Sequence, residues 1–348
     1  MSRLYFDIFT NCIFNKKLFT FGVGKAGKIS SAWKVIFTLF FAVQYNEKIR
    51  KMKNTVVFII VVGALLVHTK SFSQNIAPQD MEKFHIMEDS MLVTSDSMFD
   101  AFIPDTHTFY SERFAKQLVR TLKIPNSYYY PFDKLKEKIN LIYADDNNFR
   151  IFNWEILTSK EAKRYYGAIQ LPGEKLKLYG LLDYSEEMGK GAEDSILSNG
   201  KWFGALYYRI MSNDYQGRKI YTLFGLNSGN IESNKKVLDP LTIDEHGITF
   251  GAPIFGVASE NFPRQRINRF ILEYKKGVMV SMNWDKDRNV IIFDKLVSQV
   301  NDPHRKYTYV PSGEYDGFSW HDETWNYMQD LIPVTIMKEG QEPPGEDK

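Results

Sequence analysis

Large apolar side chains recur at helical spacing in two stretches near residue 100. A helix is predicted over residues 80–103, where one face carries side chains three, four or seven residues apart: Phe84, Met87, Met91, Met98 and Phe102. Pro104 and Asp105 are expected to interrupt it. A second helix is predicted over residues 108–123, where every fourth residue is large and apolar: Tyr110, Phe114, Leu118 and Leu122. We interpret both stripes as packing faces rather than ligand sites.

After Tyr130 the pattern changes to short strands. Segments rich in Val, Ile, Tyr and Phe alternate with polar turns up to about residue 330, which predicts about a dozen antiparallel strands. The clearest segment is 269–296, where a strand, a Lys-Lys-Gly turn, a returning strand through Trp284 and a third strand at 290–293 predict a meander with one apolar face. Two more hairpins are predicted around the polar turns 145–148 and 213–217.

These patterns predict an α+β, mostly β protein in which two N-terminal helices pack on a large antiparallel meander sheet, as a sandwich or an open barrel. We assign residues 74–130 to a helical N-terminal segment and 131–337 to an antiparallel β domain. The tail 338–348 contains Pro343 and Pro344 and no apolar residue, so it is predicted to be disordered.

An export signal is predicted some fifty residues into the chain. Lys51 and Lys53 precede a mostly apolar, uncharged run at 55–67, and small residues precede a predicted cleavage between Ser73 and Gln74. Because a membrane span takes about 20 residues, we interpret residues 52–73 as a cleaved signal peptide. Residues 1–51 would then be an upstream extension that is not part of the fold. The alternative is a membrane anchor of two hairpins, since residues 35–43 form a second apolar run.

The net charge of the chain without its leader, residues 1–73, limits which kinds of partner it can bind. Residues 1–73 hold 11 of the 44 basic and 2 of the 42 acidic residues, so the remaining 275 carry 33 basic and 40 acidic residues and a formal charge of −7. Such an acidic chain repels phosphate backbones, which argues against nucleic acid as a partner. The one cysteine, Cys12, lies in the leader, so disulfides and lipidation of an N-terminal cysteine are not expected. We predict a periplasmic or secreted protein.

The motifs in the sequence identify no reaction. Residues 22–28 match a dinucleotide glycine pattern, but no βαβ unit follows, and Ile29 stands where a phosphate loop needs Ser or Thr. Asp285, Asp287 and Asn289 resemble the start of a calcium loop whose sixth and twelfth positions are wrong. The six histidines form no closely spaced pair, and the serines form no nucleophile elbow. We therefore predict no metal site, no cofactor and no catalytic residue.

The densest polar and aromatic cluster lies at residues 315–325. It supplies our candidate ligand-binding residues: Asp316, Trp320, His321, Asp322 and Trp325. Indole rings could stack on a sugar face, and two carboxylates could act as acid and base on a glycoside. The separation of the carboxylates decides whether they can do so, and the sequence does not give it.

Five segments carry a resemblance to other proteins: 145–155, 221–225, 235–239, 250–255 and 292–296. On these segments, roughly residues 130–330 resemble a group of uncharacterised exported proteins of Bacteroidetes. The resemblance implies export and brings no known activity, cofactor or catalytic residue.

Taken together, the sequence favours an exported, non-enzymatic module of the cell envelope that binds a glycan, another ligand or a protein partner. One alternative is a secreted hydrolase that acts on carbohydrate through paired carboxylates. The other is a purely structural periplasmic protein.

Overall fold

The computed structural model describes residues 76–159, 162–229, 231–259 and 262–332, which belong to one compact unit. The upstream extension 1–51, the signal peptide 52–73, its cleavage between Ser73 and Gln74 and the tail 338–348 all lie outside the described residues, as does the glycine pattern at 22–28.

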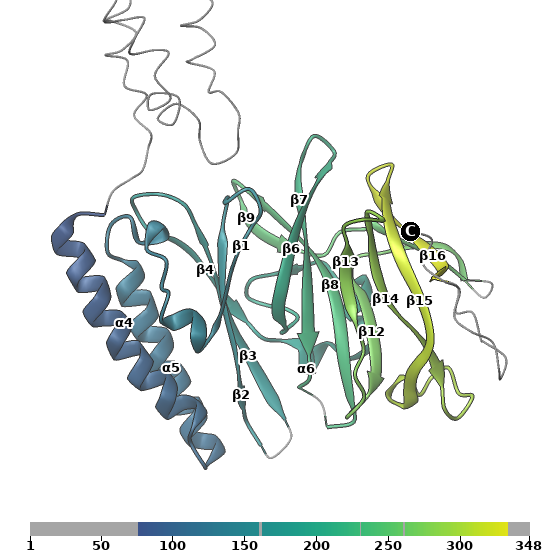
Figure 1. The fold of residues 1–348 in the computed structure, drawn as a ribbon, viewed down its shortest axis with the longest axis horizontal. Helices are drawn as coiled ribbons and strands as arrows, with labels where there is room; N and C mark the ends of the chain where they lie inside the picture. Colours follow the sequence, from purple (N-terminus) through teal and green to yellow (C-terminus); the bar gives the residue numbers. More distant parts are fainter. Residues whose placement is uncertain (1–75, 160–161, 230, 260–261, 333–348) are drawn as a thin grey trace, which may run out of the picture. The chain divides into compact units, whose positions relative to one another are not determined.

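Four layers make up this part of the chain: a pair of helices followed by three β-sheets (Figure 1). The helices cover the outer face of the first sheet, and the second sheet lies between the first and the third. The predicted fold class is confirmed, since the chain is mostly β with two N-terminal helices. The strands are distributed over three sheets rather than one, and the third sheet is mixed because β10 and β16 run parallel.

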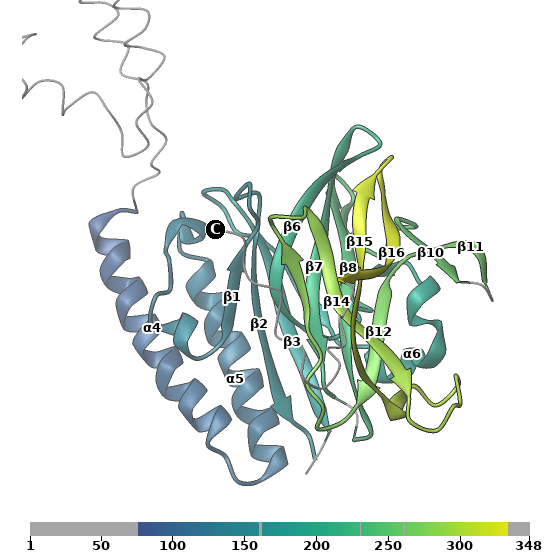
Figure 2. The same cartoon turned by 45° about the vertical axis from the view of Figure 1, so that its right-hand side comes forward.

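The two N-terminal helices are α4 (Pro78–Phe99) and α5 (Pro104–Leu122), seen side by side in Figure 2. Their predicted stripes point into the core, where Phe84 and Phe114 are fully buried. The boundary between the helices was predicted wrongly. Pro104 begins α5 instead of interrupting a helix, because proline fits the first helical turn, where its missing N–H has no partner to lose. Phe102 consequently lies in the connection and is 99% exposed.

The first sheet has the order β1-β2-β3-β4 and is wholly antiparallel. Its strands are β1 (Asn140–Tyr143), β2 (Arg150–Leu157), β3 (Lys163–Leu171) and β4 (Lys177–Leu182). Short 3-10 helices at Ser127–Tyr129 and Leu135–Glu137 connect α5 to this sheet.

The second sheet has the order β5-β9-β8-β7-β6, and β12 pairs with the first half of β8. The strands are β5 (Leu197–Ser198), β6 (Leu206–Tyr215), β7 (Arg218–Asn227), β8 (Ser233–Asp244), β9 (Gly247–Phe250) and β12 (Phe270–Lys275). A short helix α6 (Ser185–Met188) and a 3-10 helix at Gly189–Asp194 lead into it from β4.

The third sheet has the order β11-β10-β16-β15-β14-β13. The strands are β10 (Phe255–Ser259), β11 (Phe262–Ile267), β13 (Met282–Asp285), β14 (Val290–Ser298), β15 (Tyr309–His321) and β16 (Thr324–Ile332). A 3-10 helix at Lys306–Thr308 precedes β15.

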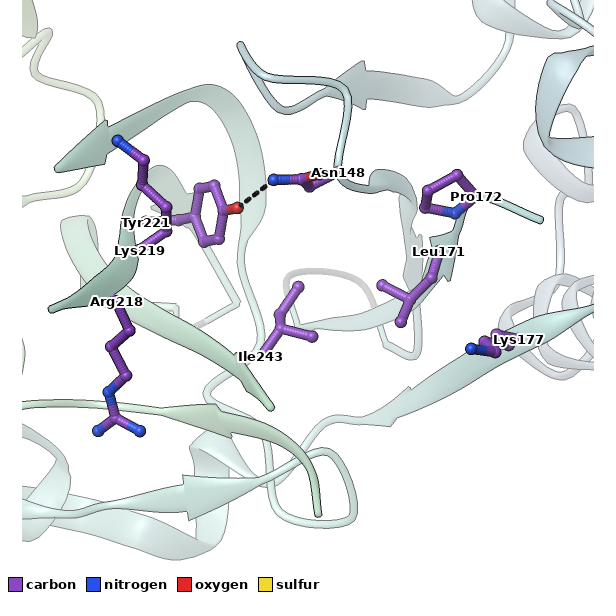
Figure 3. Close-up of a pocket in the computed structure, with 8 residues that line it drawn as sticks. All are labelled: Asn148, Leu171, Pro172, Lys177, Arg218, Lys219, Tyr221 and Ile243. Atoms are coloured by element: carbon purple, nitrogen blue, oxygen red, sulfur yellow. Dashed lines mark hydrogen bonds between the residues drawn. The ribbon is translucent and has the colours of Figure 1, made fainter. Parts of the chain in front are cut away.

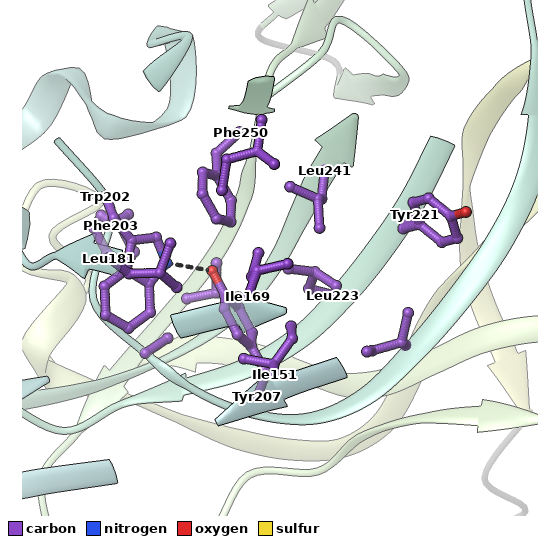
Figure 4. Close-up of a cluster of buried hydrophobic side chains, with 14 of the residues drawn as sticks. Ile151, Ile169, Leu181, Trp202, Phe203, Tyr207, Tyr221, Leu223, Leu241 and Phe250 are labelled. Atoms are coloured by element: carbon purple, nitrogen blue, oxygen red, sulfur yellow. Dashed lines mark hydrogen bonds between the residues drawn. The ribbon is translucent and has the colours of Figure 1, made fainter. Parts of the chain in front are cut away.

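Strands β2 and β7 are buried on both faces. On β2, Ile151 joins the core between the first and second sheets, whereas Phe152 and Trp154 join the core beneath the helices. Trp154 also donates a hydrogen bond from Nε1 to the Ser111 hydroxyl of α5 at 2.9 Å, which fixes that helix on the sheet. Figure 4 shows the core between the first two sheets, where Tyr207 and its neighbours fill the space between layers.

Two predicted hairpins are confirmed, and the long meander is wrong in part. β1 pairs with β2 around residues 145–148, and β6 pairs with β7 around the Gln216-Gly217 turn. β13 pairs with β14 as predicted, but β12 belongs to the second sheet and pairs with β8. The alternation identified the inward residues correctly, since Phe270 and Met282 share one core, but they face it from opposite sheets.

Candidate functional site

The predicted ligand cluster lies on the β15–β16 hairpin, and the structure does not assemble it into one site. Asp316 is 3% exposed and accepts hydrogen bonds from the Tyr327 hydroxyl and the Asp330 backbone N–H. Asp330 has a positive φ at an irregularity in the β15–β16 register. The Asp316 carboxylate therefore stabilises this bulge and is not available to a ligand.

The two tryptophans of the predicted cluster belong to the core between the second and third sheets. Trp325 is fully buried, and its Nε1 donates to the Thr222 hydroxyl of β7 at 3.0 Å. Trp320 is half-buried and packs edge-on against Trp325, with ring centroids 5.1 Å apart. A buried indole with its N–H satisfied has a packing role.

His321 and Asp322 lie at the other extreme, on the exposed turn of the same hairpin. Their side chains are 78% and 85% exposed and lie 3.4 Å apart. Asp322 and Glu323 both have positive φ, as a tight two-residue turn requires. The five predicted residues are thus divided between core and turn.

An opening of about 350 Å³ lies instead at one end of the core between the first and second sheets. One side is formed by Leu171, Pro172 and Lys177, at the end of β3 and the start of β4, with Asn148 from the β1–β2 turn. The other side is formed by the start of β7 and the end of β8: Arg218, Lys219, Tyr221 and Ile243. Figure 3 shows the residues of the β3–β4 connection facing those of β7, with Ile243 between the two groups. We call this feature the inter-sheet opening.

A hydrogen-bonded cluster holds the polar wall of the inter-sheet opening in place. The Tyr221 hydroxyl donates to Asp146 Oδ2 at 2.9 Å and accepts from Asn148 Nδ2 at 3.2 Å. Asn148 Nδ2 also donates to Asp146 Oδ2 at 2.7 Å. Burial, aided by the Asp146 carboxylate, raises the pKa of Tyr221 to about 12, so the hydroxyl stays protonated at neutral pH. The β1–β2 turn and β7 are thereby joined at this wall.

Three cations surround the aliphatic part of the opening, and the described lining contains no carboxylate. Lys219 forms an ion pair with Asp214 at 2.9 Å, and Arg218 lies 3.8 Å from Asp244. Lys177 has no ion pair with any carboxylate in the described part of the chain. An opening with aliphatic walls and a positively charged rim favours a small anionic ligand.

The sequence contained a weak signal for this site. The polar run 145–148 predicts a turn, and the sequence places basic residues at the starts of β4 and β7. Their meeting was not predictable, because it depends on which ends of the first and second sheets coincide.

The sequence also did not predict two buried arginines, Arg269 and Arg150, whose side chains are held by hydrogen bonds within the protein core. Arg269 is fully buried and donates from Nε to Asp239 Oδ1 at 2.7 Å, while the Tyr207 hydroxyl donates to Asp239 Oδ2 at 2.9 Å. Arg150 is fully buried without a carboxylate and donates to Gln170 Oε1, the Tyr143 hydroxyl and two backbone carbonyls. Desolvation lowers the pKa of Arg150.

Neither a metal cluster nor a membrane-spanning helix is present in the described ranges. These ranges contain no group of three or more His, Cys, Asp or Glu side chains arranged to hold a metal ion. None of their helices combines the length and apolarity that crossing a membrane requires. The Asp285 carboxylate of the calcium-like turn accepts the backbone N–H groups of Asp287 and Arg288 and pairs with the Arg288 side chain, so it stabilises its own turn.

No family model, curated protein or solved structure matches this chain. The resemblance to exported proteins of Bacteroidetes therefore stays a prediction, and the inter-sheet opening has to be interpreted from its own chemistry.

Proposed function

We propose that this protein is an exported, non-enzymatic binding module that holds a small ligand in the inter-sheet opening. The observation that carries the proposal is the opening itself: about 350 Å³ between two sheets, with aliphatic walls, a fixed polar cluster and cations at the rim. Ligand sites commonly combine a mostly apolar concave surface with a few fixed polar groups, and this volume is near their lower end.

The proposal that the chain is exported rests on its leader. The basic, apolar and small-residue segments of 52–73 support secretion to the periplasm or the medium. The protein isolated from its natural source should begin at Gln74. Edman sequencing that finds a start before Met52 would contradict both the cleavage and the interpretation of residues 1–51.

The described structure offers the hydrolase alternative little support. Four carboxylates of the second and third sheets each hold a separate partner: Asp316 at the bulge, Glu323 with the Gln216 N–H, Glu273 with the Ser233 hydroxyl and Asp294 with the Ser281 N–H. None of them lines the inter-sheet opening. A purely structural role is the outcome if the opening binds nothing.

A thermal-shift screen of sugars, organic acids and amino acids tests the binding proposal. Ile243→Trp fills the opening from β8, and Leu171→Trp fills it from β3, so one informative variant is available if the other does not fold. Val297→Trp on β14, where the native side chain is 45% exposed, is the matched control.

We expect at least one compound to raise the Tm of the wild type and the Val297→Trp control alike, and to leave the filled variants unchanged. Binding only to the native state raises Tm by mass action. A screen without any stabilising compound, or one in which the filled variants respond as the wild type does, would overturn the proposal.

A further inference from the structure

The cations of the inter-sheet opening differ in how far they are already neutralised. Lys219 is paired with Asp214 on the same β6–β7 hairpin, and Arg218 is only loosely matched to Asp244. Lys177, on the opposite side, has no ion pair within the described ranges. A charge-assisted contact with a bound anion is therefore best supported at Lys177.

The polar wall adds an acceptor with a fixed direction. Because a carboxylate at neutral pH only accepts hydrogen bonds, the Asn148 atom facing Asp146 must be the amide nitrogen. That nitrogen donates to both Asp146 and the Tyr221 hydroxyl, which leaves the Asn148 carbonyl oxygen without a hydrogen bond from any described residue. Asn148 lines the opening, so this oxygen can accept a hydrogen bond from a ligand hydroxyl.

The Tyr221 hydroxyl donates its one proton to Asp146 and accepts from Asn148, so it has no proton to donate to a ligand. Tyr221, which is 3% exposed, instead lines the opening beside Leu171 and Ile243 and adds apolar contact for the carbon-bound hydrogens of a ligand. The opening thus combines cationic donors, a free carbonyl acceptor and apolar contact area in a space suited to a molecule of about one or two sugar rings.

We propose that the inter-sheet opening binds a polyhydroxylated carboxylate, with its anionic group at Lys177 and a hydroxyl on the Asn148 carbonyl oxygen. This inference rests on the proposed binding function and names its ligand class. Two sources share the chemistry: a uronic acid residue of a glycan and a free sugar acid.

Isothermal titration calorimetry with three probes tests the ligand class. Methyl β-D-glucuronide represents the glycan source, D-gluconate represents the free acid, and methyl β-D-glucoside is the neutral counterpart of the glucuronide. We expect at least one carboxylate to bind about tenfold or more tightly than the glucoside, and added salt to weaken that binding selectively. Tighter binding of the glucuronide identifies the glycan source, and tighter binding of gluconate identifies the free acid.

Variants assign the contacts. Lys177→Gln should reduce the preference for carboxylate over glucoside about tenfold, the order of one charged hydrogen bond. Lys286→Gln, in the exposed β13–β14 turn, removes a lysine away from the opening and should leave the preference unchanged. Asn148→Ala should weaken the glucuronide and the glucoside by a similar factor, about fivefold, since it removes a hydroxyl acceptor and not a charge.

The outcomes distinguish the ligand class from the proposed function. If neither carboxylate binds at about 10 mM, or the glucoside binds equally well, the ligand class is wrong. A thermal-shift compound that the filled variants fail to bind would then leave the proposed function standing. An unchanged preference in Lys177→Gln would also overturn the assignment of the anionic group.

Discussion

Replacing Arg269 and replacing Asp239 should have strongly non-additive effects on the free energy of unfolding. Both side chains are fully buried in the second sheet's core, and they are joined by a 2.7 Å hydrogen bond. Arg269 Nη1 donates to the Ala192 carbonyl, while Nη2 has no partner among the described residues. Asp239→Asn keeps the shape of the side chain and removes its charge, so it leaves a cation in the core whose charge is no longer balanced.

The expected magnitude follows from the two hydrogen bonds to the carboxylate. Each hydrogen bond to a buried charged group contributes about 1.5–3 kcal/mol, so the pair from Arg269 and Tyr207 suggests about 4 kcal/mol for Asp239→Asn. Arg269→Met isolates the carboxylate and should cost about the same. The double variant leaves no unpaired charge and should cost about 3 kcal/mol, far less than the roughly 8 kcal/mol that additivity gives.

Equilibrium unfolding in urea, followed by far-ultraviolet circular dichroism, measures the four free energies of this cycle. Tryptophan fluorescence is a poor reporter here, because Trp202 donates to the Tyr207 hydroxyl and so belongs to the same network. The urea dependence should be equal in all four proteins, so that changes in midpoint report stability. A double variant that is as unstable as the sum of the single ones would refute the reasoning.

Three further predictions test other parts of the fold. Gly317→Ala should destabilise the protein by about 3 kcal/mol in urea unfolding, because a Cβ there would lie 2.3 Å from the Ile291 carbonyl oxygen, whereas Gly180→Ala has open space and should cost less than about 0.5 kcal/mol. Arg150→Lys should cost about 3 kcal/mol, measured by the same unfolding, since lysine cannot satisfy all four of the guanidinium's acceptors; an unchanged midpoint would contradict this. Stability should fall between pH 10.0 and about 12 as the native Tyr221 hydroxyl, which holds its proton longer than in the unfolded chain, is forced to ionise; a Tyr221→Phe variant should show a shallower decline, and an identical decline would show that Tyr221 contributes nothing.

The local parts of the fold were predictable because their causes are local. The helical spacing of large apolar residues, which include Phe84 in α4 and Phe114 in α5, defines the buried face of each helix. The turn residues of the β1–β2 and β6–β7 hairpins adopt the positive φ values that such turns need, at Asn147, Gln216 and Gly217. The Pro104 boundary was wrong because proline has two local meanings. Proline breaks a helix when it lies in the interior and favours a helix when it lies in the first turn. The residues around Pro104 did not show which of these two effects applies.

The arrangement of the sheets was less predictable, because alternation shows that a residue faces a core and does not show which sheet it belongs to. Phe270 and Met282 satisfy one alternating pattern from opposite sides of the same core. The predicted cluster is not brought together for a related reason. Asp316, Trp320 and Trp325 resemble a ligand cluster in sequence, yet all three turn toward the packed layers, and the rings and the carboxylate are used there for packing and for a bulge.

The packing of the three sheets on one another explains where a ligand site can exist in this fold. The middle sheet contributes side chains to the cores on both of its faces, so Tyr221 and Leu223 pack toward the first sheet while Ile220 and Phe224 pack toward the third. Space within the layers is therefore occupied by protein. Where the strands end, the apolar positions give way to turns and charged residues, and the layers no longer fill the gap. The inter-sheet opening lies at such an end, which is why its walls are aliphatic and its rim is polar.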